Sequence, residues 1–209
     1  MNEMLRYDII NKLIKKINAK TYLEIGLDSG GNFIKIECEE KFSVDPADPE
    51  AGGDEWDEGQ YVLAKPTHIM TSDEFFLQNT KTFDLIFVDG LHHAHQIEKD
   101  INNALDCLNE GGFVVCHDMS PTSVEVQAVP RAQACWTGDC WKAWVKIRSE
   151  NSNLSMYVID TDWGVGVIQR GNQELINLEG QSLEYSNLEK NRQKWLNLIS
   201  IEQFNETYE

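Results

Sequence analysis

The residues with the clearest chemical meaning are one glutamate, a group of glycines and a distant aspartate. Glu24 lies near the end of an apolar stretch, and Gly26, Gly30 and Gly31 follow it within a few residues. Glycine lets a backbone turn sharply and approach a ligand closely. Asp45 ends a second apolar stretch 19 residues after Gly26, and a carboxylate at about this spacing binds ribose hydroxyls in nucleotide-binding α/β proteins. This pattern predicts a site for a nucleoside-type cofactor.

The residue types within the turn indicate which cofactor it would take. A dinucleotide site has the pattern Gly-x-Gly-x-x-Gly, and here Asp28 stands at the second glycine position. A carboxylate close to a pyrophosphate is unfavourable because the two groups carry like charges. S-adenosylmethionine has no phosphate and carries a sulfonium and an ammonium cation, so an acidic turn suits it. The alternative is a purely structural strand-to-helix turn, with Asp45 capping the loop before Pro46.

A second group of acids and histidines follows two later apolar stretches. Asp89 ends one stretch, and His117 and Asp118 end the next. If the stretches are adjacent parallel strands, their ends lie about 5 Å apart, and Asp89, His117 and Asp118 are candidate ligands of a divalent cation. Carboxylates favour Mg²⁺ or Ca²⁺, whereas a histidine favours Mn²⁺, Fe²⁺ or Zn²⁺. Neighbouring residues of a strand point to opposite faces, so His117 and Asp118 share a ligand only if the chain is leaving the strand.

His92 is the candidate general base. It precedes the N-terminus of a predicted helix, where the helix dipole disfavours a charged imidazolium, and a neutral imidazole accepts a proton from a substrate hydroxyl. His93 and His95 compete for this role, and a solvated helix cap is the structural alternative. For Asp89 the alternatives are a helix cap or a cofactor contact, and for His117 a hydrogen-bonded position in the core.

Three tryptophans lie between Asp118 and the two predicted closing strands, namely Trp136, Trp141 and Trp144. Their rings either form a wall for a sugar or aromatic acceptor or pack in the core. Trp141 and Trp144 are three apart on a predicted helix over 140–150, so core packing is expected for at least one of them.

The composition limits the classes of protein to which the chain can belong. The chain has 209 residues, of which 41% are hydrophobic, enough for one domain with a substantial core. Its formal net charge of −17 disfavours nucleic acids and anionic membranes as partners, because binding to phosphates depends on Lys and Arg. No apolar run approaches the ~20 residues that span a membrane, and the first residues show no secretory pattern. The five cysteines contain no Cys-x-x-Cys pair, so free thiols and a cytoplasmic location are expected.

Apolar periodicity and turn residues predict alternating helices and strands. The expected helices lie near 3–18, 31–40, 94–109, 140–150 and 183–200, with another beginning at Ser72 and with Gly111 and Gly112 ending the helix at 94–109. The expected strands lie near 21–26, 41–45, 66–71, 83–90, 113–118, 154–159 and 166–168, with a loop at 46–60 and an irregular segment at 119–138. This order predicts an α/β fold with a doubly wound, mostly parallel sheet. The last two strands are joined by a turn too short for a crossover, so they should pair antiparallel.

Taken together, these motifs resemble the class I S-adenosylmethionine-dependent methyltransferases. The similarity is greatest to the small-molecule O-methyltransferase branch that includes macrocin O-methyltransferase and cephalosporin-hydroxylase-like proteins. It rests on Leu23-Glu24-Ile25-Gly26 with Gly30, Val44-Asp45, Phe87-Val88-Asp89-Gly90-Leu91-His92, Gly111-Gly112 leading to His117-Asp118, and Asp162-Trp163-Gly164-Val165-Gly166. The resemblance covers roughly residues 20–170.

The resemblance implies a Rossmann-like sheet of seven strands, mostly parallel with an antiparallel last strand. It implies a single methyltransferase domain over 1–209, with an N-terminal helix in 1–20, an acceptor-side insertion at 119–152 and a C-terminal helix at 183–200. Ser72 and Asp73 would lie near the adenine. The expected cofactor contacts are Glu24, Gly26, Ser29, Gly30, Asp45, Ser72, Asp73 and Asp89.

The resemblance also implies roles for the acids and histidines. In metal-dependent members, acids matching Asp89 and Asp118 bind Mg²⁺, and His92 matches the position of the proposed base in sugar-modifying members. The sequence departs from the pattern at His117, where a carboxylate often stands, and at Met119, where catechol-type members have an asparagine. The leading hypothesis is methyl transfer from S-adenosylmethionine to a hydroxyl of a small-molecule acceptor such as a sugar or natural product. Its catalytic residues would be His92 and Asp89, and Mg²⁺ or another divalent cation is an additional candidate cofactor.

Two other hypotheses stay open at this point. One is a nicotinamide-dependent reductase, against which Asp28 and the antiparallel ending argue. The other is a non-catalytic module that binds the nucleoside and serves as a scaffold, which a fold alone does not exclude. The sequence leaves the identity of the acceptor and a homo-oligomeric state open.

Overall fold

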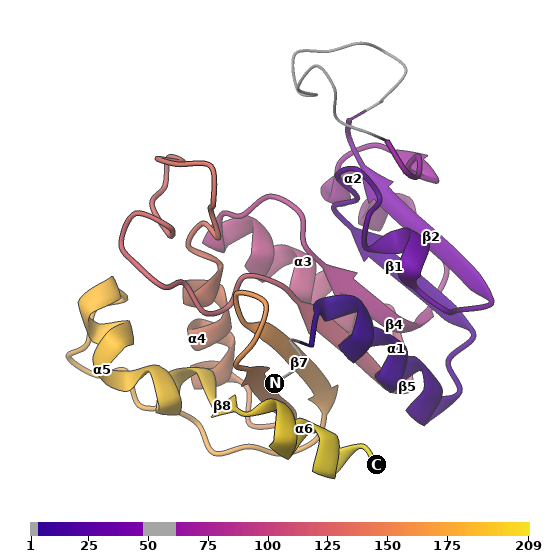
Figure 1. The fold of residues 1–209 in the computed structure, drawn as a ribbon. Coiled ribbons are helices and arrows are strands. Elements are labelled where there is room, and N and C mark those ends of the chain that lie inside the picture. The colour runs from indigo at the N-terminus through magenta and orange to yellow at the C-terminus, as the bar shows by residue number, and fades with distance from the viewer. Residues whose placement is uncertain (1–3, 48–61) are drawn as a thin grey trace.

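The structure, a computed structural model, describes residues 4–47 and 62–209, which form a sheet with helices on both faces (Figure 1). The strands are β1 (Thr21–Ile25), β2 (Glu40–Asp45), β3 (His68–Ile69), β4 (Phe83–Val88), β5 (Leu108–Cys116), β6 (Leu154–Ile159), β7 (Val165–Arg170) and β8 (Leu198–Ile199). The helices are α1 (Arg6–Ile17), α2 (Ser72–Gln78), α3 (Ala94–Asp106), α4 (Cys140–Glu150), α5 (Tyr185–Leu196) and α6 (Ile201–Thr207).

Within the described residues the sheet has eight strands in the order β3-β2-β1-β4-β5-β7-β6-β8. β1 pairs in parallel with β2 and β4, and β4 pairs in parallel with β5. β7 is antiparallel to both of its neighbours, β5 and β6. The predicted α/β class, with a mostly parallel sheet and an antiparallel pair of closing strands, is therefore confirmed.

The described part of the sheet has one strand more than the seven expected. The additional strand is β8, which has two residues and pairs in parallel with β6. It lies inside the range predicted as a helix at 183–200, because α5 ends at Leu196 and Asn197 adopts a left-handed φ of 49°. A two-residue strand has no recognisable alternation, so periodicity could not reveal it.

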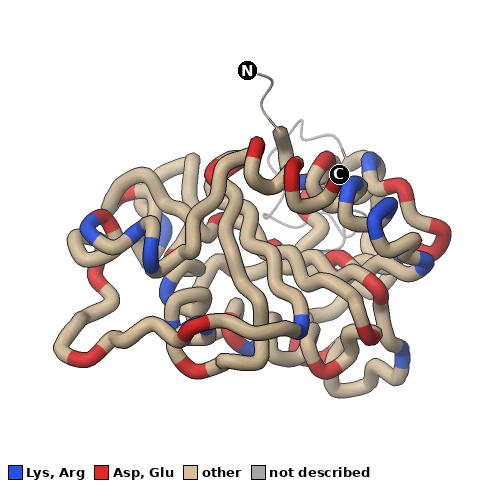
Figure 2. Tube along the Cα trace, turned by 90° about the horizontal axis from the view of Figure 1, so that it is seen from below, with Lys and Arg blue, Asp and Glu red and all other residues tan. Residues whose placement is uncertain are grey.

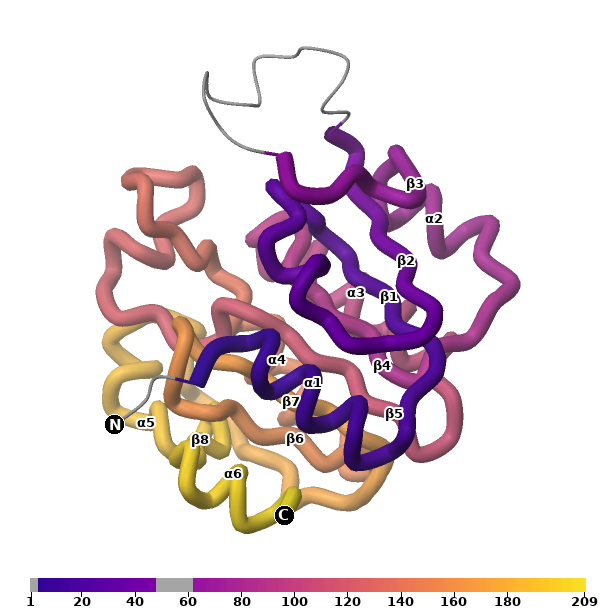
Figure 3. The backbone as a smooth tube through the Cα atoms, turned by 45° about the vertical axis from the view of Figure 1, so that its right-hand side comes forward, coloured from indigo at the N-terminus to yellow at the C-terminus, as the bar shows by residue number. Residues whose placement is uncertain are grey.

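Alternation along the central strands divides the core into two layers. Ile86 and Val88 of β4 point into a cluster with residues of α2, α3, α4 and α5, whereas Leu85 and Phe87 point into a cluster with α1 and α6. In Figure 3, α1 and α6 lie together on the near side of the strands. The sheet is therefore covered on both faces, which explains the continuous apolar run of β4.

Two predicted helix boundaries are wrong. The predicted helix at 31–40 is only a 3₁₀ turn at Phe33–Lys35, within which no side chain is buried. The helix predicted over 94–109 ends at Asp106, so Gly111 and Gly112 do not stop it but lie inside β5. A Cβ at Gly112 would lie 2.6 Å from the carbonyl oxygen of Asp84. The glycine therefore permits the close approach of β4 and β5 where their register shifts.

Several smaller expectations have clear outcomes. Trp141 and Trp144 are fully buried, and Trp141 stacks on Trp195, so both belong to the core rather than to an acceptor wall. All five cysteines are free thiols, with Cys116 buried and Cys135 exposed. The loop predicted at 46–60 lies almost entirely outside the described residues. No helix among residues 4–47 and 62–209 is long and apolar enough to cross a membrane.

Acidic and basic residues are mixed along the elements that are seen from below (Figure 2). Such a distribution of the −17 net charge is a general property of a solvated acidic surface. The exclusion of nucleic acid as a partner stays a prediction.

We expect Gly166→Ala to lower the free energy of unfolding by about 1–3 kcal/mol, because overpacking a tight core costs this much. Gly166 lies in β7 beneath the ring of buried Trp144, and an added Cβ would lie 2.9 Å from Cη2 of that ring. Urea denaturation measures the change. Gly31→Ala is the control, because a Cβ there would meet only Ser29 Oγ, at 3.5 Å. Equal losses in the two variants would contradict this account of the packing.

Candidate active site

A cavity of about 1140 Å³ opens at the carboxyl ends of β1, β2, β4 and β5. In the sheet, β2 lies on one side of β1, whereas β4 and then β5 lie on the other side. The strand order therefore reverses between β1 and β4, and ligands of open α/β sheets bind at such a switch point. The wall includes all but one of the predicted site residues, namely Glu24, Gly26, Ser29, Asp45, Ser72, Asp73, Asp89, His92, His117 and Asp118. Gly30 is the exception, and a Cβ added there would meet Ala64 at 2.7 Å.

Gly26 makes the close meeting of β1 and β4 possible. Its φ is +87°, and an added Cβ would overlap the carbonyl oxygen of Asp89. Its N–H donates to the carbonyl oxygen of Val44 at 2.9 Å, which fixes the turn against the end of β2. The backbone of the turn thus lies against both strands that carry the predicted acids, and no other residue type fits at this position.

Asp45 accepts hydrogen bonds from the turn itself. Its Oδ2 accepts from the backbone N–H of Leu27 at 2.8 Å and of Asp28 at 3.2 Å, and its Oδ1 accepts from the N–H of Ala47 at 2.9 Å. Asp45 therefore makes the contacts that were expected if it caps the loop. The same carboxylate lines the cavity at the end of β2, so the two roles are compatible.

Glu24 is a buried carboxyl with neutral hydrogen-bond donors. It is 1% exposed, and its Oε2 accepts from the hydroxyl of Tyr22 and from Nδ2 of Asn32. Burial raises the pKa of Glu24 to about 7, although both hydrogen bonds act to lower it. The group is therefore partly protonated near neutral pH, which was not evident from the sequence.

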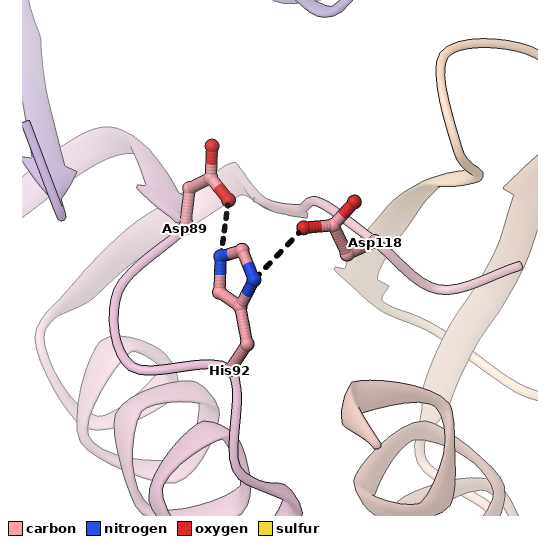
Figure 4. A group of neighbouring side chains, drawn as sticks. All are labelled: Asp89, His92 and Asp118. Atoms are coloured by element: carbon pink, nitrogen blue, oxygen red, sulfur yellow. Dashed lines mark ion pairs between the residues drawn. The ribbon is translucent and has the colours of Figure 1, made fainter. Parts of the chain in front are cut away.

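His92 lies between two carboxylates (Figure 4). Its Nε2 is 3.3 Å from Oδ1 of Asp89, and its Nδ1 is 3.2 Å from Oδ2 of Asp118. The ring of Trp136 stacks on the imidazole with centroids 5.3 Å apart. Trp136 is thus the member of the three tryptophans that faces the cavity, and it fixes the plane of the His92 ring.

The charge state expected for His92 needs correction. The helix dipole was expected to keep the imidazole neutral, and burial also acts to lower its pKa. The hydrogen bond and charge of Asp89, together with the charge of Asp118, more than offset burial, so the pKa of His92 is raised. Two carboxylates in contact with the ring thus have a larger effect than a helix terminus one residue away.

His117 contacts the same two acids. Its Nδ1 is 3.4 Å from Asp89 and 3.3 Å from Asp118, and its Nε2 is 3.4 Å from Asp162 and 2.7 Å from Nη1 of Arg6. These carboxylates raise the pKa of His117 against the opposing effect of burial. The guanidinium of Arg6 favours the neutral form of the ring, because it only donates hydrogen bonds and therefore needs a lone pair on Nε2 of His117. With Arg6 in place we assign the neutral ring, its proton on Nδ1.

The chain leaves β5 just before these residues. The strand ends at Cys116, and Asp118 adopts a left-handed φ of 64°. This turn brings the side chains of His117 and Asp118 to the same side of the sheet, which an extended strand would not do. Left-handed backbone costs roughly 1–2 kcal/mol in a residue other than glycine, and such strain is concentrated at functional sites.

The carboxylates of this group offer oxygen ligands to a cation. Within the described residues, one ligand atom each from Asp89, His92 and Asp118 lies within 4.8 Å of the others. Two carboxylate oxygens and one imidazole nitrogen fit a divalent cation of the Mn²⁺ type, and the oxygens alone fit Mg²⁺. The predicted set had His117 in place of His92. In the structure His117 also contacts Asp89 and Asp118 through Nδ1, and its Nε2 faces Arg6 and Asp162. Metal binding by either set stays a prediction.

Ser72 and Asp73 begin α2 and line the same cavity. Gln96 of α3 donates from Nε2 to Oγ of Ser72 at 3.2 Å and to Oδ1 of Asp73 at 3.0 Å. Lys99 pairs with the other oxygen of Asp73 at 3.0 Å. The two predicted adenine contacts are thus linked to the helix that follows His92.

The sequence reasoning missed Arg6, Asp162 and Gln96. Arg6 and Asp162 are separated by 156 positions, and their backbone-to-carboxylate hydrogen bond is 2.9 Å long. A single basic residue in the first turn of an amphipathic helix is normally solvated, so no local signal marked Arg6. Asp162 was recognised only as part of a tight turn.

Residues 23–119 match the model of a family described as a methyltransferase domain. No curated protein matches the chain significantly. Among solved structures, the O-methyltransferase TomG from Streptomyces achromogenes is 16% identical with a TM-score of 0.52, over 78% of this chain and 79% of that one. An O-methyltransferase from Bacillus cereus is 15% identical with a TM-score of 0.50, over 77% of each chain. The methyltransferase PaMTH1 from Podospora anserina is 17% identical with a TM-score of 0.51, over 82% and 80%.

Structural likeness at these identities shows the fold, which is the Rossmann-like fold of class I methyltransferases. The matched residues 23–119 run from β1 to just beyond β5 and thus contain the glycine turn, Asp89, His92 and Asp118. Fold and family match together confirm the resemblance predicted from the sequence. The elements outside the match are α1 and everything from α4 onward.

The buried carboxyl of Glu24 should make stability depend on pH. In the unfolded chain it loses its proton near 4.5, whereas the folded protein retains the proton to about 7. The contribution of Glu24 to stability therefore falls as pH rises between these values, by at most about 3 kcal/mol. We expect Glu24→Gln to gain stability relative to the unmodified protein between pH 5 and pH 8.

Urea denaturation of both proteins at the two pH values measures this gain. Taking the difference between the proteins cancels the acids whose lowered pKa has the opposite effect, such as Asp162. A difference that stays constant with pH would show that Glu24 ionises normally in the folded protein.

Proposed function

We propose that this chain, whose residues 23–119 match the methyltransferase-domain family, transfers a methyl group from S-adenosylmethionine to a hydroxyl of a small molecule. The observation that carries the proposal is the acidity of the cavity at the switch point. Seven acidic residues line it, Glu24, Asp28, Asp45, Asp73, Asp89, Asp118 and Asp162, against the three basic residues Arg6, Lys35 and Arg131. Such a wall suits a cationic sulfonium donor and opposes the pyrophosphate of a dinucleotide.

Solved neighbours support the choice of donor. TomG was crystallised with S-adenosylmethionine, and both the Bacillus cereus and the Podospora anserina proteins with S-adenosylhomocysteine. In the present chain Gly26 and Asp45 would contact the nucleoside, because they lie at the ends of β1 and β2 on the same side of the cavity. This assignment also makes the reductase hypothesis less favourable, since Asp28 lies in the cavity wall.

The bound donor would supply an electrophilic methyl group, which leaves its sulfonium as a neutral thioether is formed. The chain must hold the acceptor oxygen in line with that methyl group and remove its proton. Orientation of this kind accounts for a large part of the rate in reactions between two bound partners. Trp136, which stacks on His92, would form one wall for the acceptor.

His92 would accept the proton of the hydroxyl. Both of its nitrogens now face carboxylates, which favours the protonated ring. Base catalysis therefore requires that the acceptor hydroxyl enter between one nitrogen of His92 and the carboxylate that this nitrogen now faces. The other carboxylate would then keep the remaining N–H in place and stabilise the charge that develops on the ring, as the aspartate of a catalytic triad does.

A divalent cation is a second part of the proposal. Asp89 and Asp118 would provide oxygen ligands, and the cation would supply orientation of the acceptor and a lowered pKa of its hydroxyl. His92 would then act either as a third ligand or as the base, since one imidazole nitrogen cannot do both. The acceptor itself is proposed only as a small molecule with a hydroxyl group.

We expect S-adenosylmethionine to bind the full chain, and Asp45→Asn to weaken the binding about tenfold or more. The substitution removes a charge-assisted hydrogen bond to the ribose, a loss of about 1.5–3 kcal/mol. Isothermal calorimetry with S-adenosylmethionine, S-adenosylhomocysteine and NADH measures both the affinity and the choice of ligand. Glu179→Gln, which changes the net charge equally at an exposed position, is the control. Binding of NADH alone would overturn the proposal.

We expect His92→Ala to retain donor affinity within about threefold and to lose about 10²–10⁴ in methyl transfer, the usual contribution of a general base. Transfer of labelled methyl groups to pooled hydroxyl compounds measures turnover. His95→Ala is the matched control, because His95 lies exposed on α3 and its described ring contact is with His93 only. Unchanged turnover in the His92 variant would remove it from the role. A protein that binds the donor but methylates nothing would favour the scaffold hypothesis.

A further inference from the structure

Arg6 reaches into the acid–histidine cluster from outside the matched family region. We define this cluster as Asp89, His92, Asp118, Asp162 and His117. The Nη1 atom of Arg6 lies 2.7 Å from Nε2 of His117 and 3.4 Å from Oδ1 of Asp162, and its Nε lies 4.0 Å from Oδ2 of Asp89. One guanidinium thus contacts two carboxylates and the imidazole between them.

The position of Arg6 is fixed by the fold. The backbone N–H of Arg6 donates to Oδ2 of Asp162 at 2.9 Å, and the carbonyl oxygen of Met4 accepts from Oγ1 of Thr161 at 2.8 Å. Further along α1, Ile9, Ile10, Leu13 and Ile14 are buried in the core. The start of α1 therefore cannot drift away from the cluster, and only the side chain of Arg6 can withdraw.

The guanidinium and a divalent cation would use one carboxylate in common. Asp89 pairs with Arg6 and is also a member of the candidate cation group Asp89, His92 and Asp118. A positive charge a few ångströms from the cation would oppose its binding, and this repulsion is strong where water is largely excluded. The side chains of Arg6 and Asp89 are 32% and 17% exposed, whereas Asp118 is 4% exposed, so solvent screens this repulsion only in part.

We propose that Arg6 is the resident counter-cation of this cluster and sets its affinity for divalent cations. With Arg6 in place the three carboxylates are partly neutralised, and Nε2 of His117 is occupied as an acceptor. When Arg6 is absent or withdrawn, the cluster carries uncompensated negative charge and binds a cation more tightly. This inference rests on the cation site of the proposed function but not on the identity of the methyl donor. Arg6 is a positioning residue, because it acts through Asp89 and His117.

The test is the affinity of the full chain for Mn²⁺, measured by electron paramagnetic resonance as the fraction of free ion during titration. We expect Arg6→Gln to bind Mn²⁺ at least about tenfold more tightly than the unmodified protein, since a like charge beside the site has been removed. Arg6→Lys retains the charge and should stay close to the unmodified protein. A residue that merely supported the fold would not raise the affinity when removed.

Arg131→Gln is the matched control for charge. Arg131 also lines the cavity, but it stacks over Trp136 and donates to the carbonyl oxygens of Gln133 and Ala134. We expect this variant to change Mn²⁺ affinity by less than about twofold. Adding Asp118→Asn to Arg6→Gln should abolish the gain, which locates the ion at the cluster.

Two results would overturn the inference. One is an Arg6→Gln protein that is folded by circular dichroism and binds Mn²⁺ no more tightly than the unmodified protein. The other is the lack of Mn²⁺ binding by any of these variants at millimolar ion. Calorimetry with S-adenosylmethionine on the same samples separates this failure from failure of the methyl-donor proposal. The donor would still bind if only this inference fails, and the Mn²⁺ affinity would still respond to Arg6 if only the methyl-donor proposal fails.

Discussion

The meeting of β1 and β4 at their carboxyl ends is the constraint on which the site depends. Ile25 pairs with Val88, so the residues that follow, Gly26 and Asp89, must leave the sheet side by side. They do so without a side chain between them, because Gly26 has none. Backbone contact at this point brings the glycine turn, which would hold the nucleoside, within reach of Asp89. The other residues of the cavity are positioned relative to this contact.

Charge balance is the second organising principle, and it follows from the first. Once Asp89 is fixed, the parallel pairing of β4 and β5 brings His117 and Asp118 beside it. Two imidazoles and one guanidinium then lie among three carboxylates, and His92 and His117 each contact both Asp89 and Asp118. The pKa values of Asp89 and Asp162 are lowered and that of His92 is raised, because each of these groups lies against the opposite charge. A site assembled in this way can respond to the arrival of a proton, a cation or a hydroxyl.

Much of the cavity could be predicted because parallel strands all end at the same edge. Glu24, Asp45, Asp89 and Asp118 follow from this rule alone, once the apolar runs are recognised. Family resemblance added Ser72 and Asp73. What could not be predicted are contacts whose partners are far apart in sequence, such as Arg6 with Asp162, because periodicity carries no information about them. The same limit applies to Trp136, which lies in a segment without regular structure.

The errors in element boundaries have a similar origin. Gly111 and Gly112 looked like a helix stop because glycine has that meaning in isolation, yet here a neighbouring strand requires the close approach. The short strand β8 exists only because β6 offers it an edge. His92 was expected to be neutral from its place before a helix, whereas its charge state depends on two residues that the chain brings from elsewhere. Local rules failed where a tertiary contact had the larger effect.

The left-handed backbone at Asp118 and Asp162 restricts how this protein can vary. Both residues have positive φ, 64° and 44°, a conformation that glycine, asparagine and aspartate adopt far more readily than other residues. Sequence drift at either position is therefore expected to be confined to this small set. Asparagine has the shape of aspartate without its charge, so one substitution at each position would remove two of the cluster's three carboxylate charges and leave the main chain unaltered. Lineages that have lost the acidic chemistry should carry asparagine at these two positions, within an otherwise unchanged scaffold.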